Sequence, residues 1–261
     1  MSSFLLVLWI ICIYKCYGED FKPDRFHLVN YIQFENGATN WIFRGNAPII
    51  NNTFAYNTLV EYMNMSANKA GLAFPSQFYF IDISLLNPAN IPAWEIEQEF
   101  WNKHENDTNF GELINWYPSG TQSIIPPKEL TIKEQYEYCN QTYIWDIDTM
   151  PYRINYTQTN LFLKERSDNL PISMYVHCEA GCDRTGEFIG DYRLMYMDGN
   201  ITNDYNLDCS ECGRCPDYYS TTAIQWFCLC HQFGTLQPKI DWGDCVAVAN
   251  CTYLGDCHQA Q

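Results

Sequence analysis

The sequence predicts an α/β protein with a central, mostly parallel sheet flanked by helices, followed by a disulfide-rich C-terminal segment. Three observations predict it. Short apolar segments typical of buried strands alternate with amphipathic helical patterns, which is the order of an α/β layer fold. Hydrophobic residues make up 47% and aromatic residues 16% of the chain, enough for a large core. Cysteines crowd the last third of the chain.

The expected elements follow from local patterns along the chain. Thr131 and Glu134 have the spacing of a helix capping box, and Pro171 introduces an apolar strand segment. Residues 209–215 are expected to be irregular because three cysteines interrupt the pattern. We expect strands over residues 40–45, 78–83 and 172–177. We expect helices over residues 53–70, 93–103, 131–139, 160–166, 185–197 and 221–233.

The N-terminus carries an apolar run of 11 residues, 4–14, that ends at Lys15. A membrane-spanning helix needs about 20 residues, so we interpret residues 1–18 as a signal peptide. A buried N-terminal helix or a short membrane anchor is the alternative, because no Lys or Arg precedes the run. Glycosylation sequons also favour a secreted chain or an endomembrane, lysosome-like lumen. Seven are present, at Asn51, Asn64, Asn106, Asn140, Asn155, Asn200 and Asn250.

Length and charge limit the organisation and the partners. We expect one domain over residues 19–233 and a cysteine-containing tail over residues 234–261. The net charge of −16 argues against nucleic acid as a partner, because phosphate backbones require many cations. No apolar stretch after the signal peptide is long enough for a stable membrane span.

The string that carries chemistry runs from His177 to Gly186, with a strand before it and a helix after it. A tight loop between a strand and a helix turns backbone N–H groups inward and forms an anion cradle with the helix N-terminus. Gly181 permits a close backbone approach, and Arg184 offers two parallel donors to phosphate oxygens. The expected phosphate-binding residues are Glu179, Ala180, Gly181, Cys182, Asp183 and Arg184.

Cys178 would lie at the floor of this cradle. A helix N-terminus and nearby cations favour the thiolate form of a cysteine, which is the nucleophilic form. We therefore expect Cys178 to attack a bound phosphorus atom and to form a cysteinyl-phosphate that water hydrolyses. Thr185 could donate a hydrogen bond to the sulfur when it leaves.

The string His177-Cys178-X5-Arg184-Thr185 resembles the signature of the protein tyrosine phosphatase superfamily, and its Ala-Gly and Thr-Gly elements also match the dual-specificity branch. The segment from Phe43 to Pro48, which contains Arg44, is similar to the Tyr-Arg-Ser-X-X-Pro element of many dual-specificity phosphatases, where the arginine is more often structural than catalytic. The resemblance implies a phosphotyrosine phosphatase-like fold and no cofactor or metal.

The resemblance also implies a general acid on a separate loop about thirty residues before the nucleophile. Asp146 and Asp148 stand at that distance, and we prefer Asp146. Asp183 is a third candidate, because the order Gly-X-Asp-Arg-Thr looks like that of lipid-directed members such as the myotubularins.

Three functions remain open from the sequence. The first is a phosphomonoesterase acting on protein phosphotyrosine or a related small-molecule phosphate. The second is a phosphoinositide or inositol-phosphate phosphatase. Two residues disfavour it: Glu179 adds negative charge near the mouth of the loop, and Cys182 stands where the lipid-directed members often carry Lys. The third is a secreted pseudophosphatase that keeps the phosphate-binding loop without turnover.

The cysteines allow several pairings. Eleven of the 13 cysteines follow the predicted signal peptide, so at least one is free, and if it is Cys178 the other ten could form five disulfides. Cys182 could form a reversible disulfide with Cys178, line the loop as a small buried residue, or pair elsewhere. The spacing Cys209-X2-Cys212-X2-Cys215, with His231 nearby, could suggest zinc, but disulfides are favoured in a secreted chain.

Overall fold

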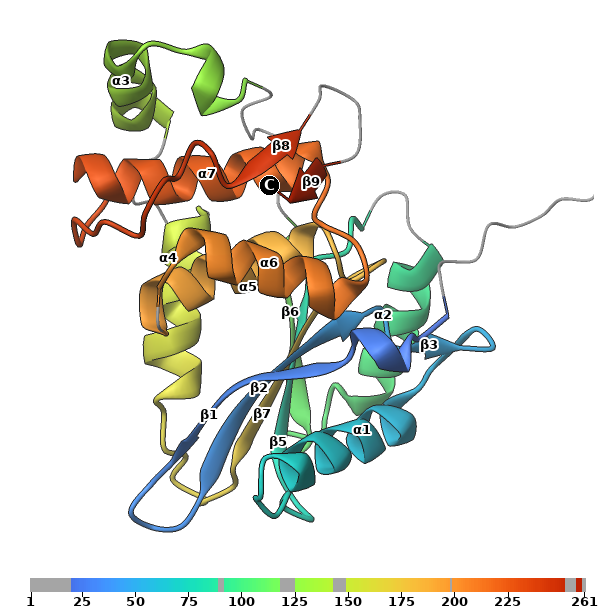
Figure 1. Cartoon of the computed structure of the whole chain (residues 1–261). Coiled ribbons are helices and arrows are strands. Elements are labelled where there is room, and N and C mark those ends of the chain that lie inside the picture. Colours follow the sequence, from blue (N-terminus) through green and yellow to red (C-terminus); the bar gives the residue numbers. More distant parts are fainter. Residues whose placement is uncertain are drawn as a thin grey trace, which may run out of the picture.

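The computed structural model describes residues 20–88, 92–117, 125–142, 149–197, 199–251 and 257–259. Its centre is a five-stranded sheet with the spatial order β1-β2-β7-β5-β6 (Figure 1). The strands are β1 (His27–Gln33), β2 (Thr39–Asn46), β5 (Tyr79–Ser84), β6 (Gly111–Asn115) and β7 (Ile172–Cys178). The predicted signal peptide lies outside the described residues.

The sheet is mixed but mostly parallel, as predicted. β2, β7, β5 and β6 pair in parallel, whereas β1 forms an antiparallel hairpin with β2 at one edge. Every residue of β2 and β7 is buried, because helices cover both faces of the sheet. The run from Ile172 to Val176 is mostly apolar, as a strand buried on both faces requires, and this run is why β7 could be predicted from the sequence.

Two helical layers cover the sheet. On one face lie α1 (Tyr56–Lys69) and α2 (Pro92–His104), which pack on aromatic side chains of the strands. On the other face lie α4 (Met150–Tyr156) and α5 (Arg184–Tyr196), which pack on aliphatic side chains of the same strands. Figure 1 shows α1 and α2 on one side of the strands and α4 and α5 on the other.

A further layer stacks on α5, away from the sheet. It contains α3 (Ile132–Thr142), α6 (Ile201–Cys212), α7 (Tyr218–Phe233) and the short pair β8 (Ala249–Cys251) and β9 (Cys257–Gln259). Leu236, Trp242 and Val248 of the C-terminal tail pack into the same apolar cluster as α7. Short elements complete the fold: η1 (Pro23–Arg25), β3 (Ile49–Ile50), β4 (Thr53–Phe54), η2 (Pro127–Glu129) and η3 (Thr157–Phe162).

Four disulfides connect this C-terminal half within the described residues. They join Cys139 to Cys230, Cys182 to Cys212, Cys209 to Cys215 and Cys228 to Cys245. The predicted disulfide-rich character of this segment is confirmed, and the zinc alternative for residues 209–215 is wrong, since all three cysteines there are paired. Within the described part of the chain, no helix is both long and apolar enough to cross a membrane.

Two predicted elements were wrong. Residues 209–212 are not irregular, because they form the last turn of α6. Asn200 caps that helix by accepting a hydrogen bond from the N–H of Asn203, and Gly213 ends it in the left-handed conformation at φ 76°. The helix expected over residues 160–166 instead lies earlier, in α4 and η3. The Thr131–Glu134 capping box is confirmed, with Thr131 N–H donating to Glu134 at 2.8 Å.

Candidate functional site

The candidate loop joins the central strand to a helix. Cys178 is the last residue of β7 and lies opposite Asn46 of β2 in the sheet register. Arg184 is the first residue of α5. The loop therefore leaves the carboxyl end of a parallel strand and enters a helix N-terminus, which is where open α/β sheets bind ligands and where anions are favoured.

The carbonyl groups of the loop are all engaged in hydrogen bonds. Each of the five residues between Cys178 and Arg184 uses its carbonyl oxygen to accept a hydrogen bond, and three of the donors come from β2 or its neighbours. The donors are Ala47 N–H to Glu179 at 3.2 Å, Arg25 Nη1 to Ala180 at 2.9 Å, Arg44 Nη2 to Gly181 at 3.0 Å, Gly186 N–H to Cys182 at 3.1 Å and Glu187 N–H to Asp183 at 2.8 Å. The first three carbonyls are thus bound by donors outside the loop, and the last two accept the first i→i−4 bonds of α5, which leaves the loop's N–H groups to face the turn.

One of those N–H groups already points at the sulfur. Gly181 donates its backbone N–H to Cys178 Sγ at 3.3 Å. Gly181 has φ 77°, and a Cβ at this position would lie 2.6 Å from the backbone carbon of Gly45. Only glycine permits both the left-handed backbone and this close approach to β2.

Among the described residues, Cys178 is the cysteine that forms no disulfide, and its side chain is only 1% exposed. Thr185, in the first turn of α5, is also fully buried, and its hydroxyl has no hydrogen-bond partner within the described part of the chain. A buried hydroxyl without a partner is costly, so it commonly indicates a contact made with a ligand or during a reaction.

Arg184 lies between two segments that follow the strands. Its Nη1 donates to the carbonyl oxygen of Leu85, just beyond β5, at 2.6 Å, and its guanidinium carbon lies 5.9 Å from the ring centre of Tyr117. No carboxylate among the described residues forms an ion pair with Arg184. The guanidinium therefore keeps its positive charge uncompensated by a neighbouring acid and has further N–H donors for an anion.

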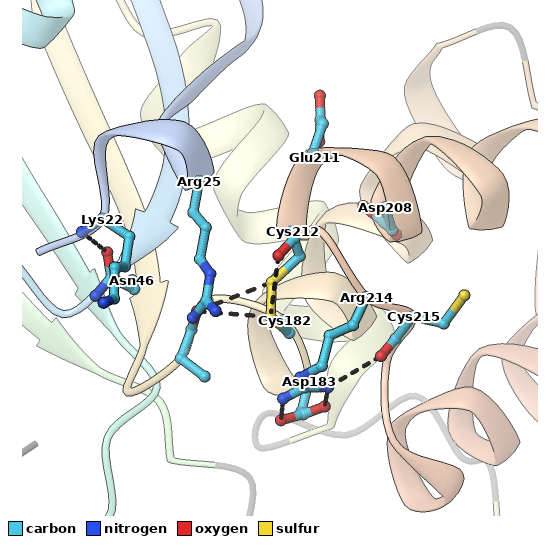
Figure 2. The surroundings of a disulfide bond; sticks show 12 residues. Lys22, Arg25, Asn46, Cys182, Asp183, Asp208, Glu211, Cys212, Arg214 and Cys215 are labelled. Atoms are coloured by element: carbon cyan, nitrogen blue, oxygen red, sulfur yellow. Dashed lines mark hydrogen bonds and ion pairs between the residues drawn. A yellow bond between two sulfur atoms is a disulfide. The ribbon is translucent and has the colours of Figure 1, made fainter. Parts of the chain in front are cut away.

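Asp183 is held by other residues. Arg214 binds it with two hydrogen bonds of 2.6 Å each (Figure 2). The backbone N–H of Asp217 also donates to it, at 2.8 Å. Both carboxylate oxygens thus act as acceptors. A general acid must carry a proton on one of these oxygens, so this arrangement disfavours Asp183 as the acid.

Cys182 is bonded to Cys212, the last residue of α6, and not to Cys178 (Figure 2). The hypothesis of a Cys178–Cys182 pair is therefore wrong for this state of the protein, and pairing elsewhere is the correct alternative. The disulfide ties the middle of the candidate loop to α6. Cys178 stays outside every described disulfide.

A buried ion network supports the loop from behind. Arg44, on β2, pairs with Asp208 and with Glu211, the latter at 3.0 Å, while its Nη2 bonds to the loop. Arg193 of α5 pairs with the same two acids. Two arginines thus balance two carboxylates, which is what charges at this depth require. Arg44 is a structural residue in this arrangement.

His177, which precedes the nucleophile candidate, is fully buried. Its Nε2 lies 2.9 Å from Glu97 Oε1 and 3.0 Å from Asp82 Oδ1. Burial, together with the nearby charge of Asp82, raises the pKa of Glu97 to about 8. Burial lowers the pKa of His177, but the two carboxylates outweigh it and bring that pKa to about 10.

The structure brings together the residues predicted from the motif and adds others. Residues 143–148, which contain Asp146 and Asp148, lie outside the described residues, so the preferred acid stays a prediction. The motif did not reveal Arg25, Cys212 and Arg214, which contact the loop from distant positions. An aspartate inside the apolar strand Tyr79–Ser84 was a signal for the buried carboxylate Asp82, and it was missed.

The sequence was compared with protein-family models and with curated proteins, and neither comparison gave a match. The fold class and the geometry of the loop therefore carry the functional argument. They define an α/β protein with a free, buried thiol at a strand-to-helix turn.

Proposed function

We propose that the protein is a cysteine-dependent phosphomonoesterase of the protein tyrosine phosphatase type, with a phosphatase-like fold and Cys178 as its nucleophile. The observation that carries the proposal is a free, buried thiol that accepts the backbone N–H of Gly181, in a loop whose first three carbonyl groups are bound by donors from outside the loop. The helix that begins at Arg184 adds its N-terminal dipole to the same point. Thiol, inward N–H groups and guanidinium are the three parts that phosphoryl transfer to sulfur requires.

The reaction would proceed in two displacements. The Cys178 thiolate attacks phosphorus, an S–P bond forms as the P–O bond to the leaving group breaks, and an aspartic acid gives its proton to the leaving oxygen. Water then gives a proton to the same carboxylate and attacks phosphorus, which releases inorganic phosphate and restores the thiolate. Thr185, with its partnerless hydroxyl, would donate to the sulfur as it leaves.

Arg184 would hold two phosphate oxygens throughout. Its Nη1 already bonds to Leu85, and a guanidinium has five N–H donors. Nε and Nη2 therefore remain for the ligand while the side chain stays anchored at the end of β5. This anchoring lowers the entropy that the side chain loses on binding a phosphate.

The general acid belongs, in this proposal, to the segment with Asp146 and Asp148. The three hydrogen bonds that Asp183 accepts support its exclusion from the role. Asp146→Ala should slow turnover most with substrates that have poor leaving groups, and Asp183→Asn should not share this dependence. The reverse pattern would transfer the acid role to Asp183, and an effect confined to Asp148→Ala would transfer it to Asp148.

We also propose that the protein works outside the cytosol, in a secreted or lumenal compartment. Four disulfides support this proposal, because disulfides persist in oxidising compartments. The substrate class we favour is protein phosphotyrosine or a related singly phosphorylated group. Glu179, at the start of the loop, disfavours ligands with several phosphates.

Hydrolysis of para-nitrophenyl phosphate by purified, oxidatively folded protein tests the activity. We expect turnover by the wild type and a loss of at least about 10³-fold in Cys178→Ser, with unchanged oxyanion binding and unfolding temperature. Full activity in Cys178→Ser would refute the assignment. Binding of phosphate without turnover in the wild type would indicate a pseudophosphatase. Faster release from inositol phosphates than from phosphotyrosine peptides would indicate the lipid-directed class.

A further inference from the structure

The side chain next to the nucleophile candidate belongs to a separate cluster on the other face of the sheet. Cys178 packs with Met174 and Val176 against the α5 face. His177 points the opposite way, where it stacks on Tyr175 at 5.4 Å between ring centres and meets Asp82 of β5 and Glu97 of α2. The cluster therefore lies behind the strand and outside the anion cradle.

One ring nitrogen in this cluster faces two carboxylates. His177 Nε2 lies within 3.0 Å of both Glu97 Oε1 and Asp82 Oδ1, but a single N–H cannot donate well to two acceptors. The hydrogen bond goes to Glu97, and Asp82 Oδ1 has no hydrogen-bond partner among the described residues although it is buried. An orphaned carboxylate oxygen at this depth needs an explanation.

The outer oxygens of both carboxylates are fixed by separate donors. Ser84 Oγ donates to Glu97 Oε2 at 2.8 Å, and Trp101 Nε1 donates to Asp82 Oδ2 at 2.9 Å. Each carboxylate thus turns its other oxygen toward His177 Nε2. Outer donors that orient carboxylate ligand atoms in this way are typical of metal sites, whereas His177 Nδ1 is buried without a partner among the described residues.

We propose that Asp82, Glu97 and His177 form a binding site for a divalent transition-metal ion of the zinc class. Their three ligand atoms lie within 4.8 Å of one another, and an ion about 2.0–2.2 Å from each would join them. The ion would displace the protons held by His177 Nε2 and Glu97, contact the Asp82 oxygen that has no hydrogen-bond partner, and balance the two resulting carboxylates with its two positive charges.

The ligand types select the class of metal. One imidazole nitrogen with two carboxylate oxygens suits Zn²⁺ or Mn²⁺, whereas Ca²⁺ and Mg²⁺ prefer oxygen ligands alone. The three residues are at most 1% exposed, so the ion enters as the chain folds and exchanges slowly afterwards. It would connect β5, β7 and α2 behind the loop, and its role would be structural.

Metal content of the full-length protein tests the proposal without any activity assay. The wild type and Glu97→Gln are produced in zinc-supplemented medium, dialysed against EDTA under native conditions and analysed by elemental mass spectrometry. We expect about one zinc per wild-type chain and at least a tenfold loss in Glu97→Gln. Glu99→Gln is the matched control, because Glu99 lies on the same helix but is exposed and pairs with Lys103.

Thermal unfolding supplies a second readout. Zinc present during folding should raise the unfolding temperature of the wild type and of Glu99→Gln, and should leave that of Glu97→Gln unchanged. Wild-type protein that carries no more metal than Glu97→Gln overturns the proposal, and so does equal zinc in all three proteins. Because metal content is measured independently of phosphate release, failure here leaves the phosphatase proposal standing, and the converse also holds.

Discussion

The α1–α2 side of the sheet and the C-terminal helical layer are stabilised by different chemistry. The first is an aromatic cluster without cysteine, in which rings from strands and helices contact one another. The second is joined by disulfides, and the four described ones lie between residues 139 and 245. The first side should therefore be insensitive to the redox state of the solution, whereas the second should depend on it.

The candidate loop lies at the boundary between these two regions. Arg44 and Ala47, on the sheet side, bond to its carbonyl groups. Cys212 and Arg214, on the helical side, hold Cys182 and Asp183. The comparison teaches that the loop takes its position from both regions, so a change in either should have a distinct signature in activity and in stability.

The largest expected effect on stability is in the aromatic region. Phe43 is fully buried and its ring contacts Phe26 at 5.4 Å and Trp41 at 6.0 Å between centres. Phe43→Ala should lower the free energy of unfolding by about 3–5 kcal/mol in urea denaturation. Tyr31→Ala, at an exposed aromatic on β1, is the control and should cost less than about 1 kcal/mol. If both variants lost the same unfolding free energy, the aromatic cluster around Phe43 would not be a main source of stability.

The next effect separates stability from activity in the cross-linked region. Removing the Cys182–Cys212 bond by a double Ala substitution should cost about 2–4 kcal/mol of unfolding free energy and about 10- to 100-fold in turnover, because the loop loses its tie to α6. The double Ala variant of Cys228 and Cys245 is the matched control, since that bond lies in the tail.

The control should lose stability but retain turnover. Dithiothreitol, which usually protects thiol enzymes, should therefore inactivate this protein while the Cys178 thiol stays reduced. If the variant without the Cys182–Cys212 bond keeps full turnover, the loop does not depend on the cross-linked layer.

The smallest effect concerns pH and a buried acid at the centre of α5. Burial, with added repulsion from Glu187 and Asp208, raises the pKa of Asp191 well above its usual range. A raised folded-state pKa means that stability is highest below about pH 4, where the unfolded chain is also protonated, and falls as the pH rises above it. Asp191→Asn should therefore match the wild type near pH 4 and exceed it by about 1–2 kcal/mol at pH 7. A gap that is constant with pH, measured by urea denaturation, would contradict this linkage.

The fold could be predicted where a local pattern was strong. The apolar run of β7 and the capping box at Thr131 each specify an element by themselves. α6 was missed because its polar, cysteine-rich sequence has little apolar periodicity, and it is stabilised by the Asn200 cap, by Gly213 and by the disulfide from Cys212 to the distant Cys182.

The candidate site was predictable only where it is contiguous in sequence. The string from Cys178 to Thr185 carries its own spacing, so these residues could be named. Arg25 is 155 positions from its partner Ala180 in the sequence, and Arg214 is 31 positions from its partner Asp183. No local sequence pattern marks such contacts. The disulfide partner of Cys182 could not be predicted either, because the tertiary structure decides the pairing and the spacing of cysteines does not.

Alkylation of the native protein by iodoacetamide, followed by peptide mass spectrometry and a turnover assay on the same samples, tests the nucleophile most directly. The account predicts modification at Cys178, loss of turnover in proportion to it, and protection of both by inorganic phosphate or vanadate. Two results would contradict the account: Cys178 found in a disulfide, or full turnover by protein in which Cys178 is alkylated.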